Sequence, residues 1–182
     1  QGVAGEKLNA LDAQLAPETQ IENVSSASPS EQQLNSLLEY YQTGQYGDAE
    51  SSALSLTQEF PKHQFGWKVL GILYGQSGRN SEAVNANQSA VELSPQDAEA
   101  HYNLGITLKE LDRLEEAEAS YTQAVALKPN FAEAHYNLGN TLKELERLDE
   151  AEASLRQAVA LKPDYAEAHS NLGNTLKELE RL

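Results

Sequence analysis

Apolar residues recur three or four positions apart in two separate runs within residues 98–131. The first run contains Leu104, Leu108 and Leu111, and the second contains Ala117, Tyr121, Ala124, Val125 and Leu127. Spacing of this kind places apolar side chains on one face of an α-helix. Pro129 ends the second run, because proline cannot continue a helix and restricts the residue before it. The pattern therefore predicts two helices, with the break between them at Asp112 to Glu115.

The same pattern returns after 34 residues. Residues 98–131 and 132–165 differ at seven positions and so agree at 27 of 34, and a third copy, residues 166–182, covers half a unit. The same frame extended backward gives units 64–97 and 30–63, of which the latter is divergent. A period of this length indicates helix pairs that bury their apolar faces against their neighbours. We expect an all-α solenoid of helix-turn-helix units.

Glycine recurs at the eighth place of three units, as Gly105, Gly139 and Gly173. Within a helix, glycine costs about 1 kcal/mol against alanine. We therefore interpret these glycines as points where paired helices pack closely. Gly44 and Gly78 fall at turns between helices, where a left-handed backbone ends a helix at little cost.

Three short sequences have the pattern of a helix start. Ser28 opens the sequence Ser-Pro-Ser-Glu, with a serine cap, a proline in the first turn and a glutamate three residues after the cap. Asn130 is followed three residues later by Glu133, and this is the spacing of a capping box. Asp164 and Glu167 repeat it. We expect helices to begin after Ser28, Asn130 and Asp164.

Residues at fixed places of the unit resemble the tetratricopeptide repeat. The series is Leu104, Gly105, Leu108, Ala117, Tyr121, Ala124 and Pro129, repeated as Leu138, Gly139, Leu142, Ala151, Leu155, Ala158 and Pro163. Within the family, the sequence A-H-Y-N-L-G-N-T-L-K-E is most similar to the repeats of O-linked N-acetylglucosamine transferases and of bacterial proteins with similar arrays. The resemblance implies a right-handed superhelical α-solenoid that binds other proteins.

Residues 1–28 contain no copy of the repeat. Three leucines between positions 8 and 15 are spaced for one short amphipathic helix that caps the array, followed by a linker. We therefore divide the chain into an N-terminal segment, residues 1–28, and a repeat domain, residues 29–182. Because the sequence contains no methionine, we expect Gln1 to result from processing or excision.

The chain is acidic, with 28 acidic and 13 basic residues and a net charge of −15. This charge would repel a phosphate backbone, so nucleic-acid binding is disfavoured. No apolar run reaches the ~20 residues that cross a bilayer, and no cysteine is present for disulfides or thiolate metal sites. We expect no cofactor and neither a membrane nor a nucleic-acid partner. The compartment stays open, with the cytoplasm favoured over secretion.

Asparagine recurs on the first helix of each unit, although it is a poor helix former. The sixth place holds Asn103, Asn137 and Asn171, and the ninth holds Asn140 and Asn174. An amide offers both donors and an acceptor, so it can bond an extended peptide backbone of any sequence. In the resembling transferases the sixth-place asparagines line the concave surface and hold peptide in this way. The alternative is that duplication has copied a neutral residue.

Tyrosine and lysine should lie on the same inner surface. The fifth place holds Tyr102 and Tyr136, and the twelfth holds Lys109, Lys143 and Lys177. We predict a peptide-binding groove less acidic than the whole chain. One groove of the family binds the C-terminal carboxylate of heat-shock chaperones through five residues. This chain has at those places Lys68, Ile72, Asn103, Glu133 and Asn137. Only two of the five match, so carboxylate capture is disfavoured.

Histidine occupies the fourth place of three units, as His101, His135 and His169. Successive units should hold these rings about 10 Å apart, too far for ligands of one metal ion. We expect packing residues rather than a metal site. No nucleophile has a visible base, and no phosphate-binding glycine loop occurs. The sequence predicts no catalytic residue and no enzyme.

The sequence favours a protein-interaction module that binds an extended peptide or partner segment in its concave groove. Two alternatives stay open. The chain is the substrate-presenting arm of a larger glycosyl- or sulfotransferase whose catalytic domain lies beyond Leu182, or it is a self-assembly element. Leu172, Leu176 and Leu179 of the last half unit would lack a covering helix. We expect them to support a homodimer through the C-terminal end.

Overall fold

The structure, a computed structural model, describes residues 28–179, which form nine α-helices and no strand. The expected short helix before residue 17 lies outside the described residues. Internal contacts divide the chain into two compact parts, Gln1–Gly66 and Trp67–Leu182. No helix among the described residues has the length and apolar character that a membrane span requires. The predicted all-α class is confirmed.

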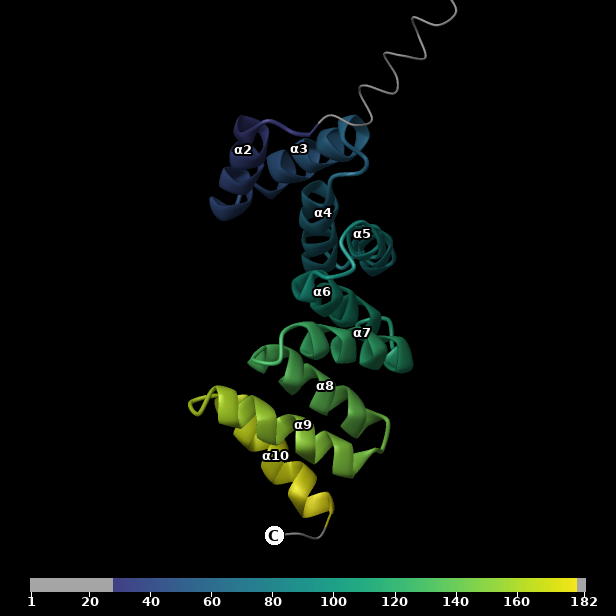
Figure 1. The fold of residues 1–182 in the computed structure, drawn as a ribbon, viewed down its shortest axis with the longest axis vertical. Coiled ribbons are helices and arrows are strands. Elements are labelled where there is room, and N and C mark those ends of the chain that lie inside the picture. Colours follow the sequence, from purple (N-terminus) through teal and green to yellow (C-terminus); the bar gives the residue numbers. More distant parts are fainter. Residues whose placement is uncertain (1–27, 180–182) are drawn as a thin grey trace, which may run out of the picture. The chain divides into compact units, whose positions relative to one another are not determined.

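The helices alternate along the chain with short turns (Figure 1). They are α2 (Glu31–Gln42), α3 (Tyr46–Glu59), α4 (Gln64–Gln76), α5 (Asn80–Leu93), α6 (Ala98–Lys109), α7 (Leu114–Leu127), α8 (Ala132–Glu144), α9 (Leu148–Leu161) and α10 (Ala166–Glu178). The first helices α4, α6, α8 and α10 begin 34 residues apart, and so do the second helices α5, α7 and α9. In the second part α6 packs on α7, α8 packs on α9, and α10 lies against α9 (Figure 1). The predicted helix-turn-helix unit is therefore present.

The core of the second part runs without a break from one helix pair to the next. One cluster of buried residues consists of Val84, Leu104, Leu108, Ala117, Tyr121, Leu138, Leu142 and Ala151. These residues come from five consecutive helices, α5 to α9. Because the α6–α7 and α8–α9 pairs share the cluster with α5, neither of these two pairs has a separate core. This is the arrangement that stacked repeats require.

Two of the eighth-place glycines lie where paired helices approach closely. A Cβ atom on Gly105 would lie 2.6 Å from the Tyr121 ring, and one on Gly139 would lie 2.7 Å from Cγ of Leu155. Real Cβ atoms do not approach other atoms this closely, so the packing interpretation is confirmed at both positions. At Gly173 the interpretation is wrong, because a Cβ there would meet nothing within 4 Å.

The turns between the two helices of a pair use a left-handed residue at the same place of each unit. Gly44 has φ 75° and Gly78 has φ 74°, which confirms the prediction for these two glycines. In the next two units the place is taken by Asp112, with φ 58°, and by Glu146, with φ 60°. A side chain in this conformation costs roughly 1–2 kcal/mol. The turns within the α6–α7 and α8–α9 pairs therefore carry a strain that the turns within the α2–α3 and α4–α5 pairs avoid.

The predicted helix starts are wrong in position. The cap of α2 is Ser30, whose Oγ accepts a hydrogen bond from the Gln33 backbone N–H at 3.2 Å. Gln33 Oε1 accepts one in return from the Ser30 backbone N–H at 3.0 Å. This capping box begins two residues after Ser28, because the first helical residue is Glu31.

The starts of α8 and α10 have no side-chain cap, so Asn130 and Asp164 are not cap residues. The residues before the two helices are Phe131 and Tyr165. Their rings pack instead on the tyrosines of the preceding first helices, with centroids 4.7 Å apart for Tyr102 and Phe131. Aromatic packing thus takes the place that a polar cap would occupy.

The leucines of α10 and its C-terminal cap are less covered than their counterparts in α8. Leu172, Leu176 and Leu179 are half-buried, whereas Leu138 and Leu142 are buried. Surface of this kind would support association with a second copy. The homodimer through this end stays a prediction.

Replacing Gly139 with leucine should lower the free energy of unfolding by about 1–3 kcal/mol, because the new side chain would overlap Leu155. The matched control is Gly173→Leu, which adds the same side chain in open space. This control should leave stability unchanged or raise it by up to about 1 kcal/mol through helix propensity. Urea unfolding measures both. Equal effects of the two variants would contradict the packing account.

Glycine at the strained turn should stabilise the chain. Glu146→Gly should raise the free energy of unfolding by about 0.5–1 kcal/mol, since the gain from relieving the left-handed backbone exceeds the entropy lost by glycine. The reverse change, Gly78→Glu, should lower it by about 1 kcal/mol. Thermal unfolding of both variants checks the pair, and a loss of stability in Glu146→Gly would refute the assignment of strain.

Candidate functional site

Two pockets lie on the first helices of successive units in the second part of the chain. The α4–α6 pocket, about 450 Å³, is lined by Ile72, Gly75, Gln76, Asn80, Asn103, Ile106, Thr107 and Glu110. The α6–α10 pocket, about 370 Å³, is lined by Lys109, Asn140, Lys143, Glu144 and Asn171. Asn80 is the first residue of α5 and Glu110 is the C-terminal cap of α6; every other lining residue comes from α4, α6, α8 or α10. Both pockets therefore belong to the helix set on which binding is predicted.

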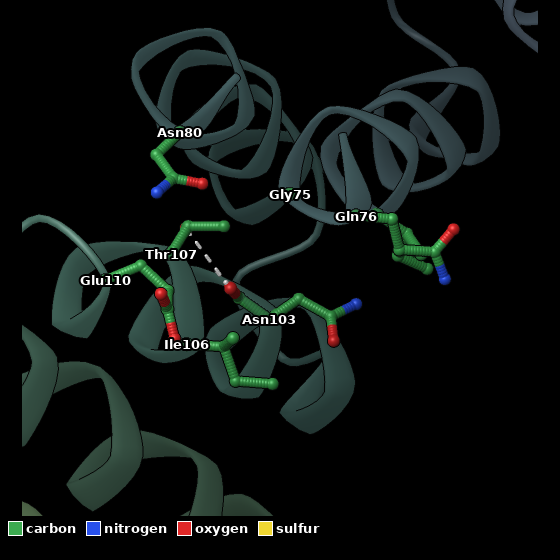
Figure 2. A pocket seen from close by; sticks show the side chains of 8 residues that line it. Gly75, Gln76, Asn80, Asn103, Ile106, Thr107 and Glu110 are labelled. Atoms are coloured by element: carbon green, nitrogen blue, oxygen red, sulfur yellow. Dashed lines mark hydrogen bonds between the residues drawn. The ribbon is translucent and has the colours of Figure 1, made fainter. Parts of the chain in front are cut away.

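The α4–α6 pocket has apolar and amide surfaces side by side. Figure 2 shows Gly75 on α4 across from Thr107 on α6, with Ile106 and Asn103 beyond it. The Thr107 hydroxyl donates to the Asn103 backbone carbonyl at 3.2 Å, as the dashed line marks. Among residues 28–179, the side-chain amides of Asn80 and Asn103 have no hydrogen-bond partner. These amides are available to a ligand.

The α6–α10 pocket is polar and bridged by ion pairs. Lys109 Nζ lies 2.8 Å from a Glu144 carboxylate oxygen, and Lys143 Nζ lies 2.7 Å from one of Glu178. Each pair joins one unit to the next. Asn171 Nδ2 donates to Asn140 Oδ1 at 2.8 Å. The lysine charges are therefore balanced by glutamates, and this pocket is not strongly basic.

Two of the three sixth-place asparagines, Asn137 and Asn171, donate to tyrosines of the preceding unit. Asn137 Nδ2 lies 3.1 Å from the Tyr102 hydroxyl oxygen, and Asn171 Nδ2 lies 3.1 Å from that of Tyr136. Each bridge connects residues 35 apart, one unit plus one place. The Asn137 amide thus joins neighbouring units through one bond, and the Asn171 amide joins them through two, to Tyr136 and to Asn140. The Oδ1 of Asn137 makes no hydrogen bond within the described residues.

Tyr102 remains protonated at neutral pH. Burial raises the pKa of its hydroxyl, and the negative charge of Glu133 raises it further, while the Asn137 hydrogen bond opposes the rise. A protonated hydroxyl that accepts from Asn137 still has its own proton to donate. Tyr102 can therefore serve as a bridge and as a donor to a ligand at once.

The structure distributes the ten predicted site residues over four places. Asn103 lies in the α4–α6 pocket. The α6–α10 pocket contains Lys109, Asn140, Lys143 and Asn171. The bridges contain Tyr102, Tyr136 and Asn137, and also Asn171. The remaining two, Asn174 and Lys177, are exposed on α10 and line neither pocket. Their role in binding peptide stays a prediction.

Sequence reasoning missed the residues that interrupt the repeat. The α4–α6 pocket depends on Gly75 and Asn80, where the next unit has Lys109 and Leu114. The contacts between units recur at a separation of 35 residues, from Tyr102 to Asn137 and from Lys109 to Glu144. A search for complementary residues at this separation would have found both kinds of bridge.

Each of the three repeated histidines forms a hydrogen bond with the loop before its helix. The partner is the carbonyl oxygen of the proline six residues earlier. The distance from Nε2 is 3.0 Å for His101 and His135 and 2.9 Å for His169. Because a carbonyl can only accept, the proton sits on Nε2. Among residues 28–179 no group of three potential metal ligands lies together.

Comparisons with known proteins give one family and many structures of the same fold. A family model described as TPR repeat matches residues 71–112, 107–145 and 139–179, more than half of the chain. MamA (residues 41 to the end) from Desulfovibrio magneticus RS-1 is 21% identical over 83% of this chain and 85% of that chain, with a TM-score of 0.76. A comparison with curated proteins found no match.

Two further solved structures share the fold. YrrB, titled a TPR protein with an unusual peptide-binding site, is 22% identical over 91% of this chain and 84% of its own, with a TM-score of 0.75. The first TPR of Spaghetti (RPAP3), bound to the HSP90 peptide SRMEEVD, is 23% identical over 64% and 93%, with a TM-score of 0.63. The finer resemblance to the repeats of O-linked N-acetylglucosamine transferases stays a prediction.

Removing one partner of a tyrosine–asparagine bridge should weaken the stacking of units. Tyr102→Phe and Asn137→Ala should each lower the free energy of unfolding by about 0.5–1.5 kcal/mol. The double variant should lose less than the sum, because both changes remove the same bond. Tyr46→Phe, at an exposed tyrosine of α3, is the control. Strict additivity in urea unfolding would mean that the bridge contributes nothing.

Proposed function

The chain belongs to the tetratricopeptide repeat family, and we propose that it is a protein-interaction module whose first helices bind an extended segment of a partner protein. One observation carries the proposal. Two pockets follow one another on the first helices of successive units, and both are lined by asparagine amides. Amides bond a peptide backbone whatever its side chains, while the pockets receive individual side chains.

The residues of the two pockets suit different parts of such a segment. In the α4–α6 pocket, Ile72 and Ile106 contact the apolar part of a side chain, and Asn103 bonds the backbone. In the α6–α10 pocket, Asn140 and Lys143 bond polar groups. Extended peptide rises about 3.3 Å per residue and packed helices lie about 10 Å apart, so roughly three residues span one unit. A segment of about ten residues reaches both pockets.

An acidic C-terminal peptide fits this surface poorly. One solved structure of the fold contains the HSP90 peptide SRMEEVD. In this chain the lysine at the corresponding place, Lys68, lies 2.8 Å from a carboxylate oxygen of Asp97 and 3.6 Å from one of Glu99. Its charge is therefore already compensated. The net charge of −15 also opposes an acidic ligand.

Binding should depend on the asparagines of both pockets. Random peptides of about ten residues, roughly 33 Å when extended, are displayed on phage and selected against the full chain. For the selected peptides, Asn103→Ala and Asn140→Ala should each weaken affinity by about 1 kcal/mol, close to fivefold in Kd, because one hydrogen bond is lost. Isothermal titration calorimetry measures the affinities.

The control is Gln123→Ala, which removes an exposed amide from α7, a second helix. It should leave affinity unchanged. Asn103→Ala should also leave the melting temperature unchanged, since the Asn103 side chain makes no hydrogen bond within the described residues. The proposal fails if no peptide is recovered, or if all three variants bind the selected peptides as tightly as the parent chain.

A further inference from the structure

A lysine–glutamate pair joins successive units at one recurring position. Lys109 pairs with Glu144 and Lys143 pairs with Glu178, and both pairs are 35 residues apart. The lysine side chains are only 25% and 28% exposed, so their aliphatic stems lie against the protein while the ammonium groups reach the carboxylates. The same register, counted back from Glu110, places the preceding lysine at position 75.

Position 75 is a glycine, and the α4–α6 pocket lies there. A Cβ on Gly75 would meet only Cγ2 of Thr107 at 3.6 Å, an ordinary contact. The helix therefore has room for a side chain that the sequence does not supply. Glu110 is left without an ion pair among residues 28–179, and it is the only charged residue that lines the pocket.

We propose that the α4–α6 pocket binds a lysine side chain of the partner segment, which takes the place of the lysine absent at position 75. Its methylene groups lie against Ile72 and Ile106, and its ammonium group pairs with Glu110. The inference rests on the proposed function and specifies the ligand. Figure 2 shows the elements of this arrangement, with Gly75 on α4, Ile106 on α6 and Glu110 at the C-terminal cap of α6.

Three properties of the pocket favour lysine over other side chains. A purely aliphatic side chain would use the isoleucines but leave the Glu110 carboxylate unpaired. An acidic one would be repelled by Glu110 and by the net charge of −15. Third, lysine is the residue that pairs with the equivalent glutamates, Glu144 and Glu178, in the later units of the same chain.

The test uses a peptide selected on the full chain that contains lysine, and the same peptide with norleucine in place of lysine. Norleucine keeps the aliphatic stem and removes the charge. The lysine form should bind about twofold to fivefold more tightly, as expected for an ion pair with an exposed carboxylate. The ratio of the two dissociation constants should fall at high salt. With Glu110→Gln the two peptides should bind equally tightly. With Glu115→Gln, which removes an exposed carboxylate from α7, the ratio should stay as in the parent chain.

A lysine introduced at position 75 of the chain itself gives a second test. Gly75→Lys should occupy the pocket and abolish the preference for the lysine peptide. It should also raise the melting temperature more than Gly75→Gln does, and the difference between the two should vanish with Glu110→Gln. Equal affinity of the lysine and norleucine peptides for the parent chain would overturn the lysine pocket and leave the proposed function standing. Recovery of no peptide at all would overturn both.

Discussion

In the α6–α7 and α8–α9 pairs, contact between a glycine on the first helix and a large side chain on the second determines how the pair closes. Gly105 admits the Tyr121 ring, and Gly139 admits Leu155, at distances that no Cβ would allow. Tyr121 is 1% exposed and Leu155 is 0% exposed, so these contacts are the centre of each pair. The pairs then stack through a continuous apolar cluster. The closure of these two pairs orients their first helices, and the first helices carry the tyrosine–asparagine and lysine–glutamate contacts between units.

Much of this architecture can be predicted from the sequence, because the period of 34 residues reveals the helices, the turns and the close-packed glycines. Helix caps are harder to predict. Asn130 and Asp164 have the spacing of capping residues, yet Phe131 and Tyr165 directly precede the helices. Phe131 packs on a tyrosine of the preceding first helix. Local pattern rules do not include such a tertiary contact, which decides where the helix begins.

The candidate site is predicted only in part, since its two halves have different origins. Asn140 and Asn171 belong to the repeated pattern and could be found from it. The α4–α6 pocket arises where the pattern is broken, at Gly75 and Asn80. The absence of a lysine at position 75 produces no recognisable sequence motif. It is recognised only by comparison with the lysine–glutamate pairs of the later units. In a near-regular array, the departures from regularity distinguish one unit from the next and give a partner a defined register.

The most direct measurement is of nuclear Overhauser effects between a bound lysine peptide and the methyl groups of the chain. If the first helices bind the partner and the pocket holds its lysine, the δ and ε protons of that lysine should show cross-peaks to the methyl groups of Ile72 and Ile106. Cross-peaks confined to methyl groups of second helices, such as Val125 of α7 or Val159 of α9, would contradict the account.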